Sequence, residues 1–359
     1  MKLKFSDKTV FAWHSWLGLI VGVFTLFLSI TGTMLLFSDE IDASLSRSLL
    51  RVERPSVQAY PLDSMLATLK QFYPEGVLRS TVLQTNQPSR AIITKIMLGG
   101  EQLLVYWNPY TNQIVGSRNR EDILMQNVLE WHEELTVGEF GHIFLFLVGL
   151  AMLGSVLTGL WYYRKSLLKV FSIGVRSKNS YLFNADLHKL LGVISCLFLL
   201  LMGGTGTFFH WEKIERMLGE EGEQAPVVKN EFKPLTLAEI NYPIDQLVKT
   251  SSEKVGDFVP KIIEYPRNEN IISVIGTRPE SVRLFGKFNS KVDFEGRSNQ
   301  LVDIEHLEDG DVELKMEKSF EQLHFGQYGG WFTKILYALG GFCLSVISLT
   351  GFMIWLKKR

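Results

Sequence analysis

Two segments far apart in the chain carry the same pattern of histidine, glycine and threonine. His14 begins an uncharged segment, with Gly18 one helical turn later and Thr31-Gly32-Thr33 at its far end. The pattern returns 174 positions later (188 − 14), from His188 to Thr205-Gly206-Thr207. A histidine inside a membrane needs compensation for its lost hydration. Two equivalent imidazoles at one membrane depth therefore predict a metal held between them, and neutral imidazole is the usual axial ligand of haem iron.

Four uncharged segments must position these side chains. They span residues 9–38, 140–163, 190–211 and 335–356. A helix of about 20 apolar residues crosses the hydrocarbon core, so each segment is long enough. The sequence predicts a membrane protein with four transmembrane α-helices, built as a duplicated two-helix unit. In an up-down bundle of this kind, helices one and three lie diagonally across the core.

Between the helices lie two longer, more polar segments that predict extracytoplasmic α+β modules. In chain order, the expected parts are transmembrane helix 1 at 10–37, module 1 at 38–130, helix 2 at 139–163, a cytoplasmic link at 164–186, helix 3 at 187–211, module 2 at 212–325 and helix 4 at 331–356.

The modules have alternating apolar patterns typical of strands. In module 1 we expect a helix at 63–73, strands at 77–83, 91–98 and 103–107, and a turn at Asn112 before a further strand. Asn tolerates the left-handed backbone that such a turn needs. In module 2 we expect a helix near 236–250 and strands at 261–265, 271–277 and 281–285.

Basic residues gather at one set of helix ends. They precede the first helix, fill the 164–186 link and close the chain at Lys357-Lys358-Arg359, whereas acidic residues flank the other ends. Cytoplasmic loops carry the excess of Lys and Arg. This distribution predicts that both termini lie in the cytoplasm and that the two large loops face outward. The net charge of −1 argues against nucleic acid as a partner.

A second pair of histidines precedes the even-numbered helices. His132 lies six residues before Gly138, and His324 lies two residues before Gly326, each glycine beginning a Gly-x-aromatic-Gly sequence. The unequal spacing predicts that the symmetry is broken there. Both histidines are expected at the edge of a loop, where exposure at the interface is the alternative to metal ligation. For His14 and His188 the alternative is a side chain that reaches the lipid headgroups.

Three further histidines have no partner at the repeat-related position. His142 and His210 lie at the outer ends of helices two and three, where either could replace an outer ligand or lie near haem propionates. They are lesser candidates because symmetry does not support them. His306 falls in the acidic stretch 303–308 and is expected to be a solvated loop residue.

Several motifs in fixed order carry a resemblance to a known family. They are His-x3-Gly with Thr-Gly-Thr in helices one and three, Asn108-Pro109-Tyr110-Thr111-Asn112-Gln113-Ile114-Val115 in the first module, and Leu-Thr-Gly closing helices two and four. Together they resemble the PepSY-associated transmembrane family over essentially the whole chain. One departure is Asn112, where the loop motif usually has glycine. The family includes inner-membrane di-haem proteins that resemble ferric-siderophore reductases.

The resemblance implies PepSY-like modules and two b-type haems. His14 and His188 would be the axial ligands of one haem near the cytoplasmic face, and His132 and His324 those of a second near the outer face. The expected activity is haem-dependent reduction of ferric iron or a ferric siderophore outside the membrane. Electrons would come from a cytoplasmic reductant or the quinone pool. The sequence has no motif for nucleotide binding or zinc-dependent proteolysis, since neither a dinucleotide-binding glycine pattern nor a His-Glu-x-x-His zinc site occurs.

A protein of another class would also explain part of the pattern. The bundle would then be a membrane anchor without a cofactor, and the modules would bind a ligand or regulate a partner. The histidine pair inside the membrane discriminates the two interpretations, because an inert anchor does not need it.

Overall fold

Two units make up the fold. The computed structural model describes residues 6–53, 58–84, 87–222, 233–267, 269–279, 286 and 288–357. We call Met1–Ser38, Asn127–Gln224 and Leu323–Arg359 the helix unit, and Asp39–Gln126 with Ala225–Gln322 the sheet unit. Each unit is assembled from segments of both sequence repeats.

Long apolar helices build the helix unit. Three of the described helices are long and apolar enough to cross a membrane: α1 (Asp7–Leu36), α6 (Glu139–Tyr163) and α12 (Gly330–Lys357). A fourth span is possible if α8 (Ser180–Ile194) and α9 (Cys196–Gly222), which are bent by 65° at their junction, cross together. Length and composition thus identify a membrane protein.

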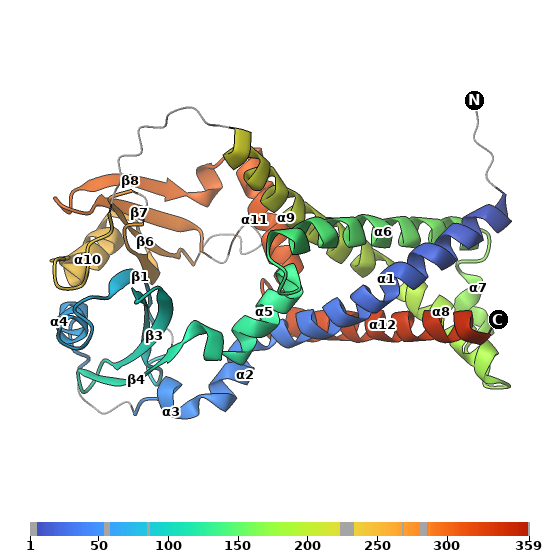
Figure 1. Ribbon diagram of the computed structural model, residues 1–359, viewed down its shortest axis with the longest axis horizontal. Helices are drawn as coiled ribbons and strands as arrows, with labels where there is room; N and C mark the ends of the chain where they lie inside the picture. Colours follow the sequence, from blue (N-terminus) through green and yellow to red (C-terminus); the bar gives the residue numbers. More distant parts are fainter. Residues whose placement is uncertain are drawn as a thin grey trace. The chain divides into compact units, whose positions relative to one another are not determined.

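The long helices pack in a closed arrangement. α1 contacts both α6 and α12, α6 contacts α9, and α12 contacts α8 (Figure 1). The α8–α9 pair therefore lies across the bundle from α1. The third predicted helix is not straight, because it is interrupted at Ser195. The equivalent position in α1 is Val21, inside an unbroken helix. Neither proline nor a glycine pair marks the bend in the sequence.

Shorter helices carry the second histidine pair. His132 lies in α5 (Leu124–Glu134) and His324 in α11 (Val312–Phe325), so the expected loop-edge positions are wrong. Residues with positive φ, including Gly138 and Gly330, turn the chain from each short helix into the following long one. The remaining short helices are α2 (Ser38–Leu45), α3 (Arg47–Leu50) and α7 (Lys169–Ile173).

The sheet unit contains one antiparallel sheet of eight strands in the order β4-β3-β2-β1-β5-β6-β7-β8. The strands are β1 (Val77–Val82), β2 (Ile92–Leu98), β3 (Glu101–Asn108), β4 (Gln113–Asn119), β5 (Val259–Glu264), β6 (Ile271–Thr277), β7 (Ser290–Glu295) and β8 (Leu301–His306). Two helices, α4 (Leu62–Phe72) and α10 (Ile244–Lys254), complete the repeated α+β pattern, and single turns of 3₁₀-helix follow β4 and β8.

The two predicted modules are joined into this single sheet, which the sequence did not reveal. β1 pairs with β5, so that Thr81 lies opposite Ile263. At the same junction α4 and α10 cap each other: the Asp245 carboxylate accepts hydrogen bonds from the backbone N–H groups of Leu62 (3.0 Å) and Asp63 (2.9 Å), and the Asp245 N–H donates to the Asp63 carboxylate. Side chains from both halves, including Trp107 and Phe294, share one buried core.

The second half of the sheet differs from its prediction in three places. α10 begins at Ile244, after Pro243, rather than near 236. Strands β7 and β8 were not predicted, although apolar and charged residues alternate in both, as at Val292 and Phe294 of β7. The acidic stretch expected as a loop is part of β8, where the Nδ1 atom of His306 lies 3.0 Å from the Ser290 hydroxyl. The expected strand at 281–285 lies outside the described residues.

Asn112 fixes the turn between β3 and β4. Its φ of 53° is the left-handed value predicted from the sequence. Its Oδ1 atom accepts hydrogen bonds from the indole N–H of the fully buried Trp107 (3.1 Å) and from the Thr68 hydroxyl (3.1 Å).

We expect Asn112→Ala to destabilise the sheet unit by about 1–3 kcal/mol, because the buried indole N–H loses its acceptor. The matched control is Asn299→Ala: Asn299 has a similar φ of 57°, but its Oδ1 has no hydrogen-bond partner within the described structure. Chemical denaturation of the purified full-length protein, followed by tryptophan fluorescence, measures both. Equal losses in the two variants would show that the backbone angle, not the hydrogen bonds, sets the cost.

Candidate functional site

His14 of α1 and His188 of α8 face each other across the helix unit. Their ring centroids are 6.3 Å apart, and the ring planes make an angle of 67°. His14 Nδ1 lies 2.9 Å from the backbone carbonyl of Ser155, and His188 Nδ1 lies 3.0 Å from that of Ile347. A carbonyl can only accept, so both Nδ1 atoms carry the proton. In each ring Nε2 therefore keeps its lone pair.

His132 of α5 and His324 of α11 repeat this arrangement. Their ring centroids are 6.4 Å apart, at 59°. Here threonine hydroxyls hold the rings: Thr31 Oγ1 lies 2.8 Å from His132 Nδ1, and Thr205 Oγ1 lies 2.7 Å from His324 Nδ1. Each hydroxyl donates its only proton to the carbonyl four residues earlier in its own helix. It must therefore accept from the histidine, which again leaves the lone pair on Nε2.

Each of the four imidazoles packs against a glycine that follows a threonine. A Cβ atom on that glycine would lie close to the ring Cε1: 3.0 Å at Gly159 for His14, 3.1 Å at Gly351 for His188, 3.0 Å at Gly32 for His132 and 3.4 Å at Gly206 for His324. The four Thr-Gly pairs, in α1, α6, α9 and α12, thus make room for the imidazole rings. The sequence showed these motifs, but it did not predict that their glycines contact the imidazoles.

The second threonine of each Thr-Gly-Thr motif has a different partner. A Cβ atom at Gly149 would collide with Thr207, and one at Gly341 would collide with Thr33. These contacts show that α6 and α12 are repeats offset by 192 positions (341 − 149). The same offset relates His132 to His324 and Gly159 to Gly351. The predicted break in symmetry is therefore wrong, because it rested on aligning Gly138 with Gly326.

The separation within each pair suits an atom between the rings. Two imidazoles on opposite sides of one metal ion, with metal–nitrogen bonds of about 2.0–2.1 Å, place their centroids roughly 6.3 Å apart. Within the described residues, no three His, Cys, Asp or Glu side chains are grouped to hold an ion by themselves. Two trans imidazoles with nothing else suit an ion whose other four ligands come from a macrocycle. The donor set of both pairs therefore fits haem.

The environment of the His132–His324 pair keeps its rings neutral. Burial lowers the pKa of His132 to about 4 and that of His324 to about 3. Desolvation disfavours the charged imidazolium, and the hydrogen bonds to threonine hydroxyls do not offset it. At neutral pH both rings are in the form that binds a metal.

The two lesser candidates, His142 of α6 and His210 of α9, form a third pair of another kind. Their ring centroids are 5.5 Å apart, and their Nδ1 atoms approach to 3.3 Å. This spacing leaves no room for an ion on the line between the rings. The structure thus groups six of the seven histidines in three pairs, and only His306 lies in the sheet unit.

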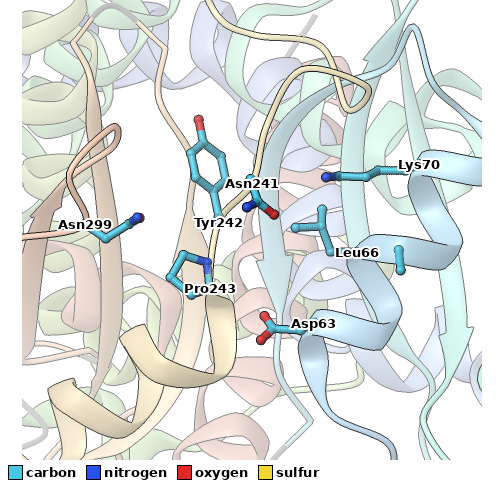
Figure 2. A pocket seen from close by; sticks show the side chains of 8 residues that line it. Asp63, Leu66, Lys70, Asn241, Tyr242, Pro243 and Asn299 are labelled. Atoms are coloured by element: carbon cyan, nitrogen blue, oxygen red, sulfur yellow. The ribbon is translucent and has the colours of Figure 1, made fainter.

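The sheet unit holds a polar pocket of about 380 Å³ beside the junction of α4 and α10 (Figure 2). Asp63, Leu66 and Lys70 of α4 line one side, and Asn241 to Pro243 and Asn299 line the other. Burial raises the pKa of Asp63, and the nearby Asp245 carboxylate adds to the shift. Sequence analysis did not identify this pocket, since its lining residues come from distant parts of the chain.

Comparison with known proteins agrees with this architecture. The family model for the PepSY-associated TM region matches residues 11–358, which is essentially the whole chain. No curated protein matches the sequence. The match confirms the resemblance that the ordered motifs predicted. The chain belongs to the family of the PepSY-associated TM region.

Proposed function

We propose that this protein is a di-haem b electron-transfer protein of the bacterial inner membrane. It would reduce ferric iron or ferric siderophores on the outer side and act as a haem-dependent ferric reductase. The observation that carries the proposal is the pair of equivalent imidazole couples, each with a centroid separation near 6.3 Å and with Nδ1 anchored. An inert anchor has no use for four half-buried imidazoles arranged in this way.

In this proposal the protein's own groups hold and tune the cofactors. Haem b, when bound, supplies one-electron transfer through its iron. The Nε2 atoms of His14 and His188 would hold one haem, and those of His132 and His324 the other. The carbonyls of Ser155 and Ile347 and the hydroxyls of Thr31 and Thr205 accept from Nδ1–H, which orients each ring and raises its basicity.

The direction of transfer follows from the proposed orientation. With the basic segments in the cytoplasm, His14 and His188 lie near the inner face, and the sheet unit lies outside. Electrons would enter from a cytoplasmic reductant or the quinone pool. Reduction labilises chelated iron because Fe(II), softer and less charged, binds hard oxygen ligands far less strongly than Fe(III) does.

The test is the reoxidation of the reduced protein by ferric chelates. Protein in detergent is reduced, freed of excess reductant and mixed with a ferric hydroxamate or ferric citrate, while a ferrous-specific chromophore reports Fe(II). We expect haem oxidation and Fe(II) formation at equal rates and in a ratio of one Fe(II) per haem. A haem protein that stays reduced with both chelates would contradict the ferric acceptor and leave only electron transfer to another partner.

Thr205→Val is expected to loosen one haem without removing a ligand. The variant removes the acceptor of His324 Nδ1–H, and loss of such a partner typically costs about 10–100-fold in metal affinity. Thr205→Ser keeps the hydroxyl and should restore wild-type behaviour. The measurement is the rate of haem transfer to apomyoglobin from each variant. Equal rates for valine and serine would show that the hydrogen bond has no such role.

The pocket in the sheet unit favours a second candidate, a membrane anchor that carries a binding module. Its carboxylate, ammonium and amide groups suit a small polar ligand. If the purified chain holds no haem, ligand binding at Asp63 and Lys70 is the function to examine next.

A further inference from the structure

The His142–His210 pair lies outside the duplicated design. The offsets that relate the other two pairs place Lys334 opposite His142 and Leu36 opposite His210. The His142–His210 pair therefore has no equivalent pair of histidines in the sequence repeat. A pair of imidazoles added at only one end of a symmetric bundle indicates a role that only this end has.

The C-terminal end of α5 lies against the first ring of this pair. The His142 ring makes a hydrogen bond to the backbone of Glu133, and Glu134 Oε2 lies 3.9 Å from His142 Nε2, which is an ion-pair distance. A carboxylate beside Nε2 favours the tautomer with its proton on that atom. The lone pair of His142 is then on Nδ1, which faces His210 Nδ1.

The two Nδ1 atoms are 3.3 Å apart and share a hydrogen bond, and the same distance suits neighbouring ligands on one ion. Nitrogens that share an ion through bonds of about 2.0–2.1 Å lie roughly 2.9–3.4 Å apart when the angle at the metal is roughly 90–109°. The haem pairs are spaced for opposite sides of a metal, whereas this pair is spaced for adjacent corners. Adjacent ligation leaves the other positions open to water or to a chelate.

Charges of both signs surround the pair. Of these charges, Lys213 of α9 has the largest effect on His142 and opposes a cation, and it also acts on His210. Glu134 of α5 and Glu139 of α6 act on His142 in the opposite sense. His210 also lies within electrostatic range of His132. His210 follows Thr205, the residue that holds His324, by five positions, which is about 7.5 Å along the helix.

We propose that His142 and His210 bind a divalent first-row transition-metal ion, with Glu134 as the positioning carboxylate. Imidazole nitrogen suits such ions. The assignment of the physiological occupant as Fe(II), the product of reduction at the neighbouring histidine pair, rests on the proposed function. Ion binding itself does not.

The test uses Co(II) as a probe on the full-length protein in detergent, purified after haem-supplemented expression so that the other two histidine pairs are occupied. Bound Co(II), counted by equilibrium dialysis and elemental analysis, should saturate at one ion per chain. We expect His142→Asn and His210→Asn each to weaken binding at least tenfold, and Glu134→Gln to weaken it about tenfold. His306→Asn, at the one histidine of the sheet unit, is the matched control and should bind as wild type does.

Haem content separates this proposal from the proposed function. His142→Asn and His210→Asn should keep the wild-type number of haems after haem-supplemented expression. Loss of a haem in either variant would make that residue a haem ligand and overturn the ion site. Co(II) binding that is the same in wild type and in the double variant would also overturn it. Saturable Co(II) binding in a protein that takes up no haem would leave the ion site standing and remove the proposed function.

Discussion

Replacing His188 by alanine is expected to lower the haem content from two per chain to one. His188 Nε2 is the only lone pair that its ring offers, because Nδ1 is held by the Ile347 carbonyl. A haem held by His14 alone would have one protein ligand instead of two and would bind less tightly. His14→Ala should give the same result. The measurement is haem extracted per chain, together with the spectrum of what remains.

His306→Ala is the control for this experiment, and it should keep two haems because His306 lies in β8 of the sheet unit. The variants must also insert and elute as wild type does, which size-exclusion chromatography in detergent reports. Two full equivalents of haem in both His14→Ala and His188→Ala would remove these residues as ligands.

Gly32→Val is expected to remove the other haem although all four histidines remain. The Cβ of any residue at this position would lie 3.0 Å from His132 Cε1, so valine must push the imidazole away from Thr31. A misplaced ring cannot hold the iron and keep its hydrogen bond. Gly22→Val in the same helix is the matched control, because a Cβ there meets no described atom within 4 Å.

We expect haem content to fall to one per chain in Gly32→Val and to stay at two in Gly22→Val. The spectrum of the remaining haem should be that of the His14–His188 site. Equal haem content in the two glycine variants would contradict the seat proposed for His132. Equal loss in both would show that valine in α1 disturbs the helix in general.

The sequence was sufficient to find the residues that pair. Two histidines lie 174 positions apart in predicted transmembrane helices 1 and 3. This spacing predicted that His14 lies opposite His188, and the structure brings these rings together. The second pair was also named correctly. The local structure around the second pair was predicted wrongly. The two halves had been aligned on Gly138 and Gly326, which lie in turns, instead of on the Thr-Gly sequences deeper in the helices. The offset of 192 becomes clear only when Gly149 and Gly341 are seen against their threonines.

Other features depend on contacts that no local pattern encodes. The pairing of β1 with β5 joins strands about 180 positions apart through only a few residues, so two separate modules were the simpler expectation. No proline in the sequence predicts the bend at Ser195. The Ser195 hydroxyl is buried without a hydrogen-bond partner among the described residues. The short distance between His142 and His210 likewise follows from the packing of α6 on α9, not from symmetry.

The central claim is that each of the two trans histidine pairs holds a haem. The most direct measurement is the absorption spectrum of the detergent-purified protein, oxidised and then reduced, with extracted haem counted per chain. We predict two b-type haems with low-spin, bis-histidine features in both states. A protein that remains colourless after expression with added haem would contradict the claim.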